Sequence, residues 1–322
     1  MTIESIRATV IDDFNAVNAL IVNKIESQIS LIDDMSHHVI ESGGKRLRPL
    51  LVLLTSNACG YEGKNHIALA GMVEFFHTAT LLHDDVVDES TLRRGHKTAN
   101  NIWGSKASIL VGDYLFTQSI ELMLDSGNAE ITKLFSNTAL EISCGEVKQL
   151  SNRHNPALTF TEYFDVIRAK TALLFAAAAC IGPMLSNASK EIQDSLYAYG
   201  LHLGNAFQLI DDALDYCSDA KTMGKNIGDD LADGKATLPL IHALHCGSEF
   251  QKQYIIESLK KGSLEFLPEI LIALEETKAI EYTKKIAAQE IDSALSCLMV
   301  LPESKYKEAL RQLAQFALQR SY

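Results

Sequence analysis

Two aspartate clusters, each at the end of an apolar helical stretch, constrain this chain more than any other feature of its sequence. They share one spacing and comprise Asp84, Asp85 and Asp88 in the first aspartate cluster and Asp211, Asp212 and Asp215 in the second. On a helix that turns about 100° per residue, the carboxylates of each cluster lie within an arc of about 100°. Carboxylates this close repel one another unless a cation lies between them. Each cluster therefore predicts a divalent metal site, and we expect the two to face each other across one cavity.

The segments around the clusters are typical of long helices. Apolar residues recur at three- and four-residue spacing from Ile6 to Ile40, and no sustained alternating pattern indicates a strand. We expect the longest helices at about residues 66–88, 105–125, 129–150, 159–180 and 190–215. Helices this apolar must surround one another, so the sequence predicts an all-α bundle with a deep central cavity. Because the motifs share one chemistry along most of the chain, we expect a single domain over residues 1–322.

Composition disfavours several classes of protein. The 29 basic and 41 acidic residues give a net charge of −12, which argues against nucleic-acid binding and means that an anionic substrate needs local cations or metal. The six cysteines form no CxxC pair, as expected for reduced thiols in a cytosol. We see no signal peptide and no stretch that would span a bilayer, and therefore expect a soluble cytoplasmic protein.

Local cations do occur, in a loop that precedes an expected helix. In the segment Glu41–Pro49, two glycines free the backbone, and Lys45, Arg46 and Arg48 follow them. Cations beside open backbone N–H groups at a helix start form a binding place for phosphate. The alternative is a solvated basic turn, which we regard as the weaker interpretation in an acidic chain with two aspartate clusters.

Further basic side chains lie close in sequence to the clusters. His77 lies two helical turns before Asp84 on the same face, and Arg93 and Arg94 follow the first cluster directly. Lys170 lies inside an apolar helix, where a lysine is costly unless an anion pairs with it.

The second cluster has comparable neighbours. Gln208 comes shortly before it and could offer its carbonyl dipole to a cation. The loop from Gly224 to Pro239 combines glycines with Lys225 and Lys235, which indicates a mobile flap able to close over phosphate. A plain surface loop is the alternative.

Together these motifs resemble those of the trans-prenyl diphosphate synthases. The matching stretches, in the same order and spacing, are GGKRLRP, LLHDDVVDESTLRRG, the pair Lys170-Thr171, FQLIDDALDY and GKNIGDDLADGKATLP. Within that family the chain is most similar to the bacterial enzymes that make the octaprenyl side chain of quinones. The resemblance implies an isoprenoid-synthase-type helical bundle and a prenyltransferase that condenses isopentenyl diphosphate onto farnesyl diphosphate.

The resemblance also implies roles for the matching residues. About three Mg²⁺ ions, or alternatively Mn²⁺, would bind the allylic diphosphate to the six aspartates, with Asp84 and Asp211 among the catalytic residues. The basic residues that would complete this cage are Arg93, Lys170, Lys225 and Lys235. Those that would bind isopentenyl diphosphate without metal are Lys45, Arg48, His77 and Arg94. The backbone carbonyl of Thr171 and the side chain of Gln208 would stabilise the allylic cation. Enzymes of this family pair as homodimers, and release of an apolar product could involve transient contact with a membrane.

Product length is expected to depend on how far a tunnel between the helices remains open. Ala79 and Thr80 lie five and four residues before Asp84, where family members with short products have a bulky aromatic residue. These small side chains predict a long product, with Met123 or Phe135 on a neighbouring helix as its floor. Ordinary close packing of helices is the alternative explanation for Ala79.

Three other functions are compatible with parts of the pattern. The pair His83-Asp84 occurs on a helix, as in helical metal-dependent phosphohydrolases, but that function gives the second cluster no role. A terpene cyclase also ionises diphosphates, but usually has one such cluster and lacks the GGKR loop. A non-catalytic subunit of a heterodimeric prenyl synthase typically loses aspartates or basic residues, and this chain retains them.

Overall fold

The computed structural model describes residues 2–93, 95–217 and 227–319, and its elements are predominantly α-helices. In chain order the elements are α1 (Ile3–Arg7), the 3-10 turn η1 (Ala8–Val10), α2 (Ile11–Ile25), α3 (Ser30–Glu41), α4 (Leu47–Ala58), α5 (Asn65–Val87), β1 (Leu92–Arg93), β2 (His96–Lys97), α6 (Ala99–Trp103), α7 (Ser105–Asp125), α8 (Ala129–Ser151), α9 (Phe160–Ile167), the π-helical segment η2 (Arg168–Ala172), α10 (Leu173–Leu185), α11 (Lys190–Leu214), α13 (Asp229–Ala232), α14 (Leu238–Cys246), α15 (Glu249–Lys261), α16 (Leu267–Glu276), α17 (Ala279–Cys297), the 3-10 turn η3 (Leu298–Val300) and α18 (Lys305–Leu318). Within the described residues, β1 and β2 form the sole sheet, an antiparallel pair. None of the helices in these residues is long and apolar enough to cross a membrane. The prediction of an all-α fold is confirmed.

The chain divides into two compact units, each assembled from separate stretches. The first unit takes the chain up to Asn137, with Leu174–Gly200 and Cys297–Leu313. The second takes Thr138–Leu173, Leu201–Ser296 and the chain from Ala314. The first aspartate cluster therefore belongs to the first unit and the second cluster to the second unit.

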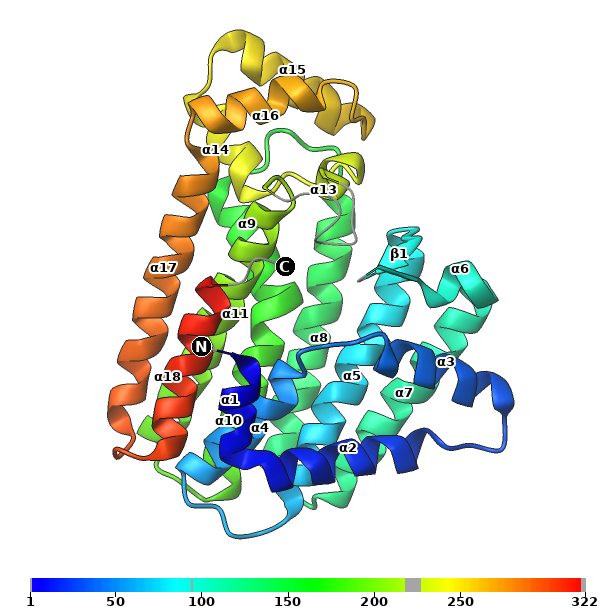
Figure 1. Ribbon diagram of the computed structural model, residues 1–322, viewed down its shortest axis with the longest axis vertical. Helices are drawn as coiled ribbons and strands as arrows, with labels where there is room; N and C mark the ends of the chain where they lie inside the picture. The colour runs from blue at the N-terminus through cyan, green and yellow to red at the C-terminus, as the bar shows by residue number, and fades with distance from the viewer. Residues whose placement is uncertain (1, 94, 218–226, 320–322) are drawn as a thin grey trace. The chain divides into compact units, whose positions relative to one another are not determined.

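The core of the first unit is built around α5, which packs against α2, α4 and α7 (Figure 1). α5 is apolar around most of its circumference, and Leu69, Met72 and Phe75 are fully buried. α4 is buried in the same way over Leu50–Leu54. A helix that is apolar on all sides is stable only inside a core, so this composition places α5 between its neighbours.

α10 approaches α4 so closely that the chain requires glycine at position 182. A Cβ atom on Gly182 would overlap the backbone nitrogen of Ser56 and the carbonyl carbon of Thr55. Backbone atoms cannot rotate away as the end of a long side chain can, so this contact has no room for a methyl group.

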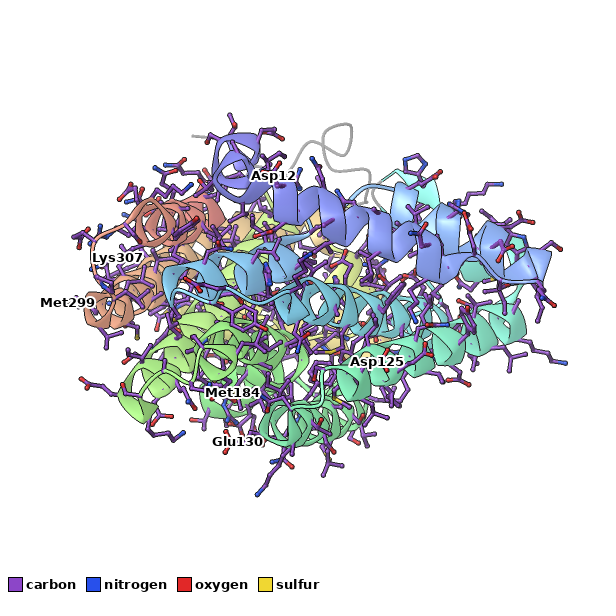
Figure 2. The ribbon with its side chains drawn as sticks, turned by 90° about the horizontal axis from the view of Figure 1, so that it is seen from below. Asp12, Asp125, Glu130, Met184, Met299 and Lys307 are labelled. Atoms are coloured by element: carbon purple, nitrogen blue, oxygen red, sulfur yellow. The ribbon has the colours of Figure 1, made fainter. Side chains whose placement is uncertain are left out.

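The turn between α7 and α8 matches its sequence signals. Gly127 has a φ of +64°, and the Oδ1 atom of Asn128 accepts hydrogen bonds from the backbone N–H groups of Glu130 and Ile131 at 3.1 Å each. Figure 2 labels Asp125, the last residue of α7, and Glu130, in the first turn of α8; both are exposed. A carboxylate in the first turn also interacts favourably with the helix dipole.

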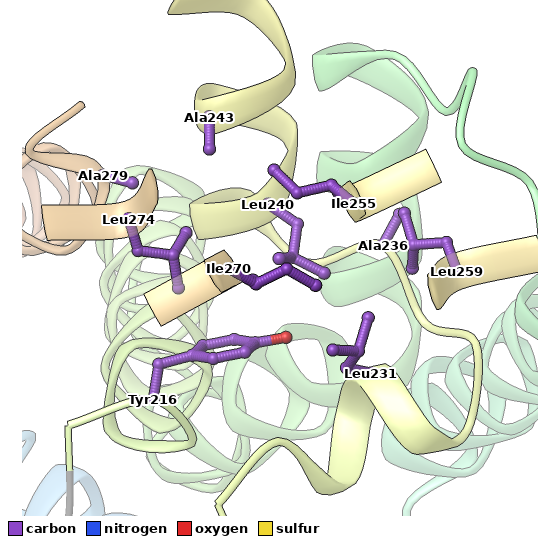
Figure 3. Close-up of a cluster of buried hydrophobic side chains, with 10 residues drawn as sticks. All are labelled: Tyr216, Leu231, Ala236, Leu240, Ala243, Ile255, Leu259, Ile270, Leu274 and Ala279. Atoms are coloured by element: carbon purple, nitrogen blue, oxygen red, sulfur yellow. The ribbon is translucent and has the colours of Figure 1, made fainter. Parts of the chain in front are cut away.

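The second unit has its own core, to which the C-terminal helices contribute. Its buried side chains, drawn in Figure 3, come from the residue after the second cluster, from α13 and the loop that follows it, and from α14–α17; they are Tyr216, Leu231, Ala236, Leu240, Ala243, Ile255, Leu259, Ile270, Leu274 and Ala279. The C-terminal helices, which carry no motif, thus pack against the segments that do.

One helix differs from the sequence-based expectation. The helix expected from Thr159 to about Cys180 begins with a capping box formed by Thr159 and Glu162, but a π-helical segment divides it and α10 continues to Leu185. The described part of the expected flap contains α13, where Leu231 is fully buried.

The close contact at Gly182 leads to a stability prediction. We expect Gly182→Ala to lower the free energy of unfolding by about 3 kcal/mol, because the added methyl group must displace backbone. Urea denaturation would measure this loss. Gly63→Ala is the matched control, since a Cβ there meets the side chain of Tyr61, which can move. Equal losses in the two variants would contradict the assignment of Gly182 to a close helix contact.

Candidate functional site

The first aspartate cluster lies where α5 ends. Asp84 and Asp85 occupy its last turn, and the backbone N–H of Asp88 donates to the carbonyl of Asp84 at 2.8 Å. Glu89 then adopts a φ of +49°, which an α-helix cannot continue. Asp85 is 5% exposed, whereas Asp84 and Asp88 are partly exposed. The cluster therefore buries its middle carboxylate and leaves the outer two partly accessible.

The buried carboxylate of Asp85 is paired with Arg93. The Nε and Nη2 atoms of Arg93 donate to Asp85 Oδ1 at 2.9 and 2.7 Å. Arg93 lies on β1, so the short hairpin that follows the cluster returns the arginine to it. Asn100 donates to the backbone carbonyl of Asp85 at 3.0 Å and holds the same turn. The structure thus pairs Arg93 with the middle aspartate of the first cluster.

The basic loop before α4 is held by the N-terminal helices. Arg46 adopts a φ of +43° at the start of α4, and its guanidinium donates to the side-chain oxygen of Asn18 on α2. Arg7, on α1, donates to the backbone carbonyl of Lys45 at 2.6 Å. The loop is thus fixed at two neighbouring residues by side chains that the sequence did not indicate.

Arg48 and His77, both expected to bind isopentenyl diphosphate, lie together. Arg48 Nη1 lies 3.0 Å from His77 Nε2, and the guanidinium carbon lies 4.4 Å from the centre of the Phe175 ring. Phe175 is fully buried on α10. A cation over an aromatic face is attracted by the ring quadrupole, so Phe175 helps to orient Arg48.

The residues expected to limit product length are mostly buried in the first unit. Ala79, Met123 and Phe135 are buried, and Thr80 is partly buried. Phe135 packs edge-on against Phe76, with ring centroids 4.9 Å apart. Phe76 lies eight residues before Asp84 on α5, and Phe116 packs against it at 5.8 Å. This places Phe135 in an aromatic group about two helical turns from the first cluster.

The second aspartate cluster lies at the end of α11, in the second unit. Asp212 is 2% exposed and Asp215 is buried, whereas Asp211 is partly exposed. Both oxygens of Asp212 accept hydrogen bonds, Oδ2 from the hydroxyl of Tyr163 at 2.6 Å and Oδ1 from Nε2 of Gln208 at 2.7 Å. The Oε1 atom of Gln208 in turn accepts from the hydroxyl of Thr171 at 2.8 Å. The structure thus joins Thr171, Gln208 and Asp212 by hydrogen bonds between their side chains.

Lys170 lies in the π-helical segment, and its ammonium group is paired with α8. Its Nζ atom donates to Glu146 Oε2 at 2.8 Å and to Gln149 Oε1 at 2.9 Å. A π-helical turn displaces side chains relative to a regular α-helix and is frequent at functional sites. The sequence indicated that an anion should meet this lysine, and Glu146 is one such anion.

Asp230 is a neighbour of the second cluster to which the sequence assigned no role. Its backbone N–H donates to Asp215 Oδ2 at 3.3 Å, so α13 contacts the cluster directly. The pKa of Asp212 is raised to about 8, chiefly by burial and then by the carboxylate of Asp230, although the hydrogen bonds from Tyr163 and Gln208 act to lower it. The adjacent acidic residues in the GDDLADG stretch were the available signal for this contact.

Lys235 is the expected basic residue of the flap that lies within the described part of the chain. Lys235 donates to Asp233 Oδ2 at 2.8 Å, and its backbone N–H donates to the carbonyl of Asp230 at 2.8 Å. Lys235 therefore lies close to the loop that meets the second cluster. Arg94 and Lys225 lie outside the described residues.

The donor chemistry of both clusters fits a hard divalent cation. Their side chains supply carboxylate oxygens, and a cation beside Asp212 would offset the acidic neighbours that raise its pKa. Within the described residues, no three His, Cys, Asp or Glu side chains already form a metal-binding group. Mg²⁺ usually binds through one or two carboxylates together with water and substrate phosphates, so these clusters suit an ion bound jointly with a diphosphate.

Comparison with known proteins places the chain among relatives of the same length. A family model described as polyprenyl synthetase matches residues 29–269. The octaprenyl diphosphate synthase of Escherichia coli K12 is 43% identical over 321 residues, which cover 99% of each chain. The all-trans-nonaprenyl-diphosphate synthase (geranyl-diphosphate specific) of Rhodobacter capsulatus is 43% identical over 318 residues, which cover 98% of each chain.

A solved structure has the same fold over the whole chain. The polyprenyl synthase of Caulobacter crescentus, complexed with calcium and isoprenyl diphosphate, matches with a TM-score of 0.96 at 38% identity, covering 100% of this chain and 98% of that one. The isoprenoid-synthase-type fold expected from the motifs is thereby confirmed. From its fold, its motifs and these full-length similarities, the chain belongs to the polyprenyl synthetase family and is a prenyltransferase.

Proposed function

We propose that this chain is an octaprenyl diphosphate synthase, which extends farnesyl diphosphate with isopentenyl diphosphate to make the precursor of a quinone side chain. The coarser activity, synthesis of long-chain trans-polyprenyl diphosphates, follows from the family and its full-length relatives. The observation that most supports octaprenyl is the 43% identity to the Escherichia coli enzyme over 99% of the chain. An equal identity to a nonaprenyl synthase makes product length the property to measure.

The two clusters would hold about three Mg²⁺ ions, or Mn²⁺, through their carboxylate oxygens. When bound, these ions would neutralise the diphosphate as the allylic C–O bond breaks. Arg93 is suited to assist because its pair with Asp85 already holds it beside the first cluster. Lys170 and Lys235, with Lys225, would supply further positive charge to the leaving group.

The allylic cation would be stabilised by neutral oxygens rather than by a protein nucleophile. We assign this role to the backbone carbonyl of Thr171 and to the side chain of Gln208, which are joined by a hydrogen bond of 2.8 Å between their side chains. Attack by the double bond of isopentenyl diphosphate would form the new C–C bond, and a proton would then pass to the released diphosphate. No Ser-His-Asp or Cys-His arrangement is needed for this sequence of steps.

Isopentenyl diphosphate would bind at the basic loop. Arg48 and His77 lie within hydrogen-bonding distance, and Lys45 lies on the segment that Arg7 fixes. Donors held in position before the substrate arrives lose less conformational entropy on binding, which favours recognition of a diphosphate without metal.

The phosphohydrolase alternative is disfavoured by the position of His83. That function requires histidines as metal ligands, but His83 Nε2 lies 3.2 Å from the carbonyl of Ile109 and 3.4 Å from Asp113, both on α7. An activity assay distinguishes an active synthase from a non-catalytic subunit, since such a subunit would not elongate farnesyl diphosphate by itself.

We further propose that the chain acts in the cytoplasm as a homodimer, with residues 1–322 as one functional domain. A row of apolar side chains on α8 supports the dimer: Leu140 and Val147 are each 65% exposed, and Leu150 is also exposed. Residues 140 and 147 are seven apart and therefore lie on one face of the helix. A second copy that covers this face would remove apolar surface from water.

The reaction is tested by incubating purified protein with Mg²⁺, labelled isopentenyl diphosphate and farnesyl diphosphate, and sizing the dephosphorylated products. We expect octaprenyl as the main product, loss of activity with chelator, and a fall of about a hundredfold or more in Asp84→Ala. Asp125→Ala, which changes an exposed aspartate at the end of α7, is the control and should retain activity. A folded protein that elongates nothing in the presence of Mg²⁺ would refute the enzyme proposal.

Chain length is tested at Ala79. We expect Ala79→Tyr to shorten the product to the farnesyl or geranylgeranyl range, because the ring would fill space beside α5. Chromatography of the dephosphorylated products measures this change. Ala79→Ser, which adds little volume, should leave the product length unaltered. An unchanged product distribution in Ala79→Tyr would show that this residue does not line the path of the chain.

The dimer is tested with Val147→Asp, which places a charge in the apolar row of α8. We expect the variant to elute as a monomer, because burying an unpaired carboxylate against a second copy is costly. Light scattering after gel filtration measures the mass. Phe250→Asp, at a side chain that is 75% exposed on α15, is the control and should leave the assembly unchanged. A wild-type monomer would exclude the homodimer.

A further inference from the structure

His154 lies in the connection between α8 and α9 and adopts an uncommon backbone conformation there. Its φ is +61°, in the left-handed region that a residue with a side chain seldom adopts unless its surroundings enforce it. None of the sequence motifs includes this histidine. In the structure, two other segments of the second unit contact it, the loop after α13 and the end of α15.

The loop after α13 contacts His154 through Gly234. The backbone N–H of His154 donates to the carbonyl of Gly234 at 2.8 Å. Gly234 has a φ of +67°, and a Cβ atom placed on it would come within 2.4 Å of Nδ1 of the His154 ring. The imidazole therefore lies directly against the backbone of the loop, at a distance that leaves no room for a side chain on residue 234.

The end of α15 contacts the same imidazole. Nδ1 of His154 lies 2.9 Å from the carbonyl oxygen of Leu259, and because a carbonyl only accepts, Nδ1 donates to it. A Cβ atom placed on Gly262, the residue that ends α15, would lie 3.1 Å from Cε1 of the ring. The side chain of Leu259 is fully buried in the core that Figure 3 shows. His154 thus joins the loop after α13 to a helix that the core of the second unit holds in place.

The loop that His154 contacts carries Lys235. The backbone N–H of Lys235 donates to the carbonyl of Asp230 at 2.8 Å, and the backbone N–H of Asp230 donates to Asp215 Oδ2 at 3.3 Å. The loop is therefore tied to the second cluster at Asp230 and to α15 through His154 at Gly234. Displacement of Gly234 would also displace Lys235, because one planar peptide bond joins the two residues.

We propose that His154 is a positioning residue, which anchors the loop after α13 to α15 and thereby holds Lys235 in place for the allylic diphosphate. The inference deepens the proposed function and rests on it for the role of Lys235. A lysine side chain loses much rotamer freedom when its ammonium group binds an anion, and a fixed backbone at its base keeps the total loss of entropy small. Release of the anchor should therefore weaken binding of the allylic substrate. Binding of isopentenyl diphosphate, which the proposed function assigns to the basic loop before α4, should change little.

The test compares His154→Gly with His154→Asn in the full-length protein. Glycine accepts the left-handed backbone but removes the ring and its donor. Asparagine also accepts this conformation, and its Nδ2 donor is bonded to Cγ as histidine Nδ1 is. We expect His154→Gly to raise KM for farnesyl diphosphate about tenfold, while kcat and KM for isopentenyl diphosphate change less than about threefold. His154→Asn should keep all three constants within about threefold of wild type.

Hydrogen exchange followed by mass spectrometry tests the anchor without turnover. In His154→Gly the amides of residues 230–236 should exchange about tenfold faster or more, and in His154→Asn they should exchange as in wild type. Because His154 is exposed, both variants should unfold at urea concentrations close to that of wild type.

His242→Ala is the matched structural control. His242 also lies in the second unit, where its Nε2 atom is 3.2 Å from the carbonyl of Thr277 and its ring stacks on Tyr282. This variant removes a histidine–carbonyl contact of the same kind away from the loop. It should leave KM for farnesyl diphosphate and the exchange of residues 230–236 unchanged.

A double variant tests whether His154 acts through Lys235. If it does, adding His154→Gly to Lys235→Met should raise KM for farnesyl diphosphate less than about twofold beyond Lys235→Met alone. Full additivity of the two substitutions would contradict the inference.

The inference also fails if His154→Gly leaves the exchange of residues 230–236 unaltered, or if it raises KM for both diphosphates alike. Loss of the folded state in His154→Gly would assign the residue a general structural role instead. Absence of elongation by the wild-type protein would remove the proposed function, whereas the exchange measurement would still report on the anchor. The two kinds of failure are therefore distinguishable.

Discussion

Carboxylates withdrawn from water at the ends of apolar helices are the constraint on which much of this structure depends. A buried carboxylate is costly unless donors or cations surround it, and leaving one without its partner costs about 3–5 kcal/mol. The chain meets this requirement differently in its two clusters. Asp85 is paired with Arg93 from a short hairpin, and Asp212 is bonded to Tyr163 and Gln208. These contacts explain how the middle aspartate of each cluster can be buried.

In the proposed function the basic residues meet the opposite requirement, since they must be held in position without being neutralised completely. Arg48 lies between His77 and the ring of Phe175, while Arg7 fixes the carbonyl of Lys45. Lys170 contacts Glu146 and Gln149 in the second unit. Groups oriented in this way need little rearrangement on binding, so more of their interaction energy is available for affinity and catalysis.

The segments without motifs have a clear structural purpose in the second unit. Helices α14–α17 form a core with Tyr216, which directly follows the second cluster, and with Leu231 of α13. Asp230, beside Leu231, contacts Asp215 through its backbone N–H. Packing of the C-terminal helices thus stabilises both the end of α11 and the loop that contacts it. Hydrophobic periodicity shows which face of each C-terminal helix is buried, but it does not show which segment that face packs against.

The sequence by itself determined the helical fold and the ends of most long helices, and it located the two aspartate clusters. Helical periodicity, capping residues and carboxylate spacing are local, so they can be recognised within one stretch of chain. Tertiary structure decided which groups pair: Arg93 with Asp85, Arg48 with Phe175, Lys170 with Glu146, and Tyr163 with Asp212. It also decided the π-helical turn at Thr171. These features depend on contacts between residues far apart in sequence, where packing and burial outweigh local preference.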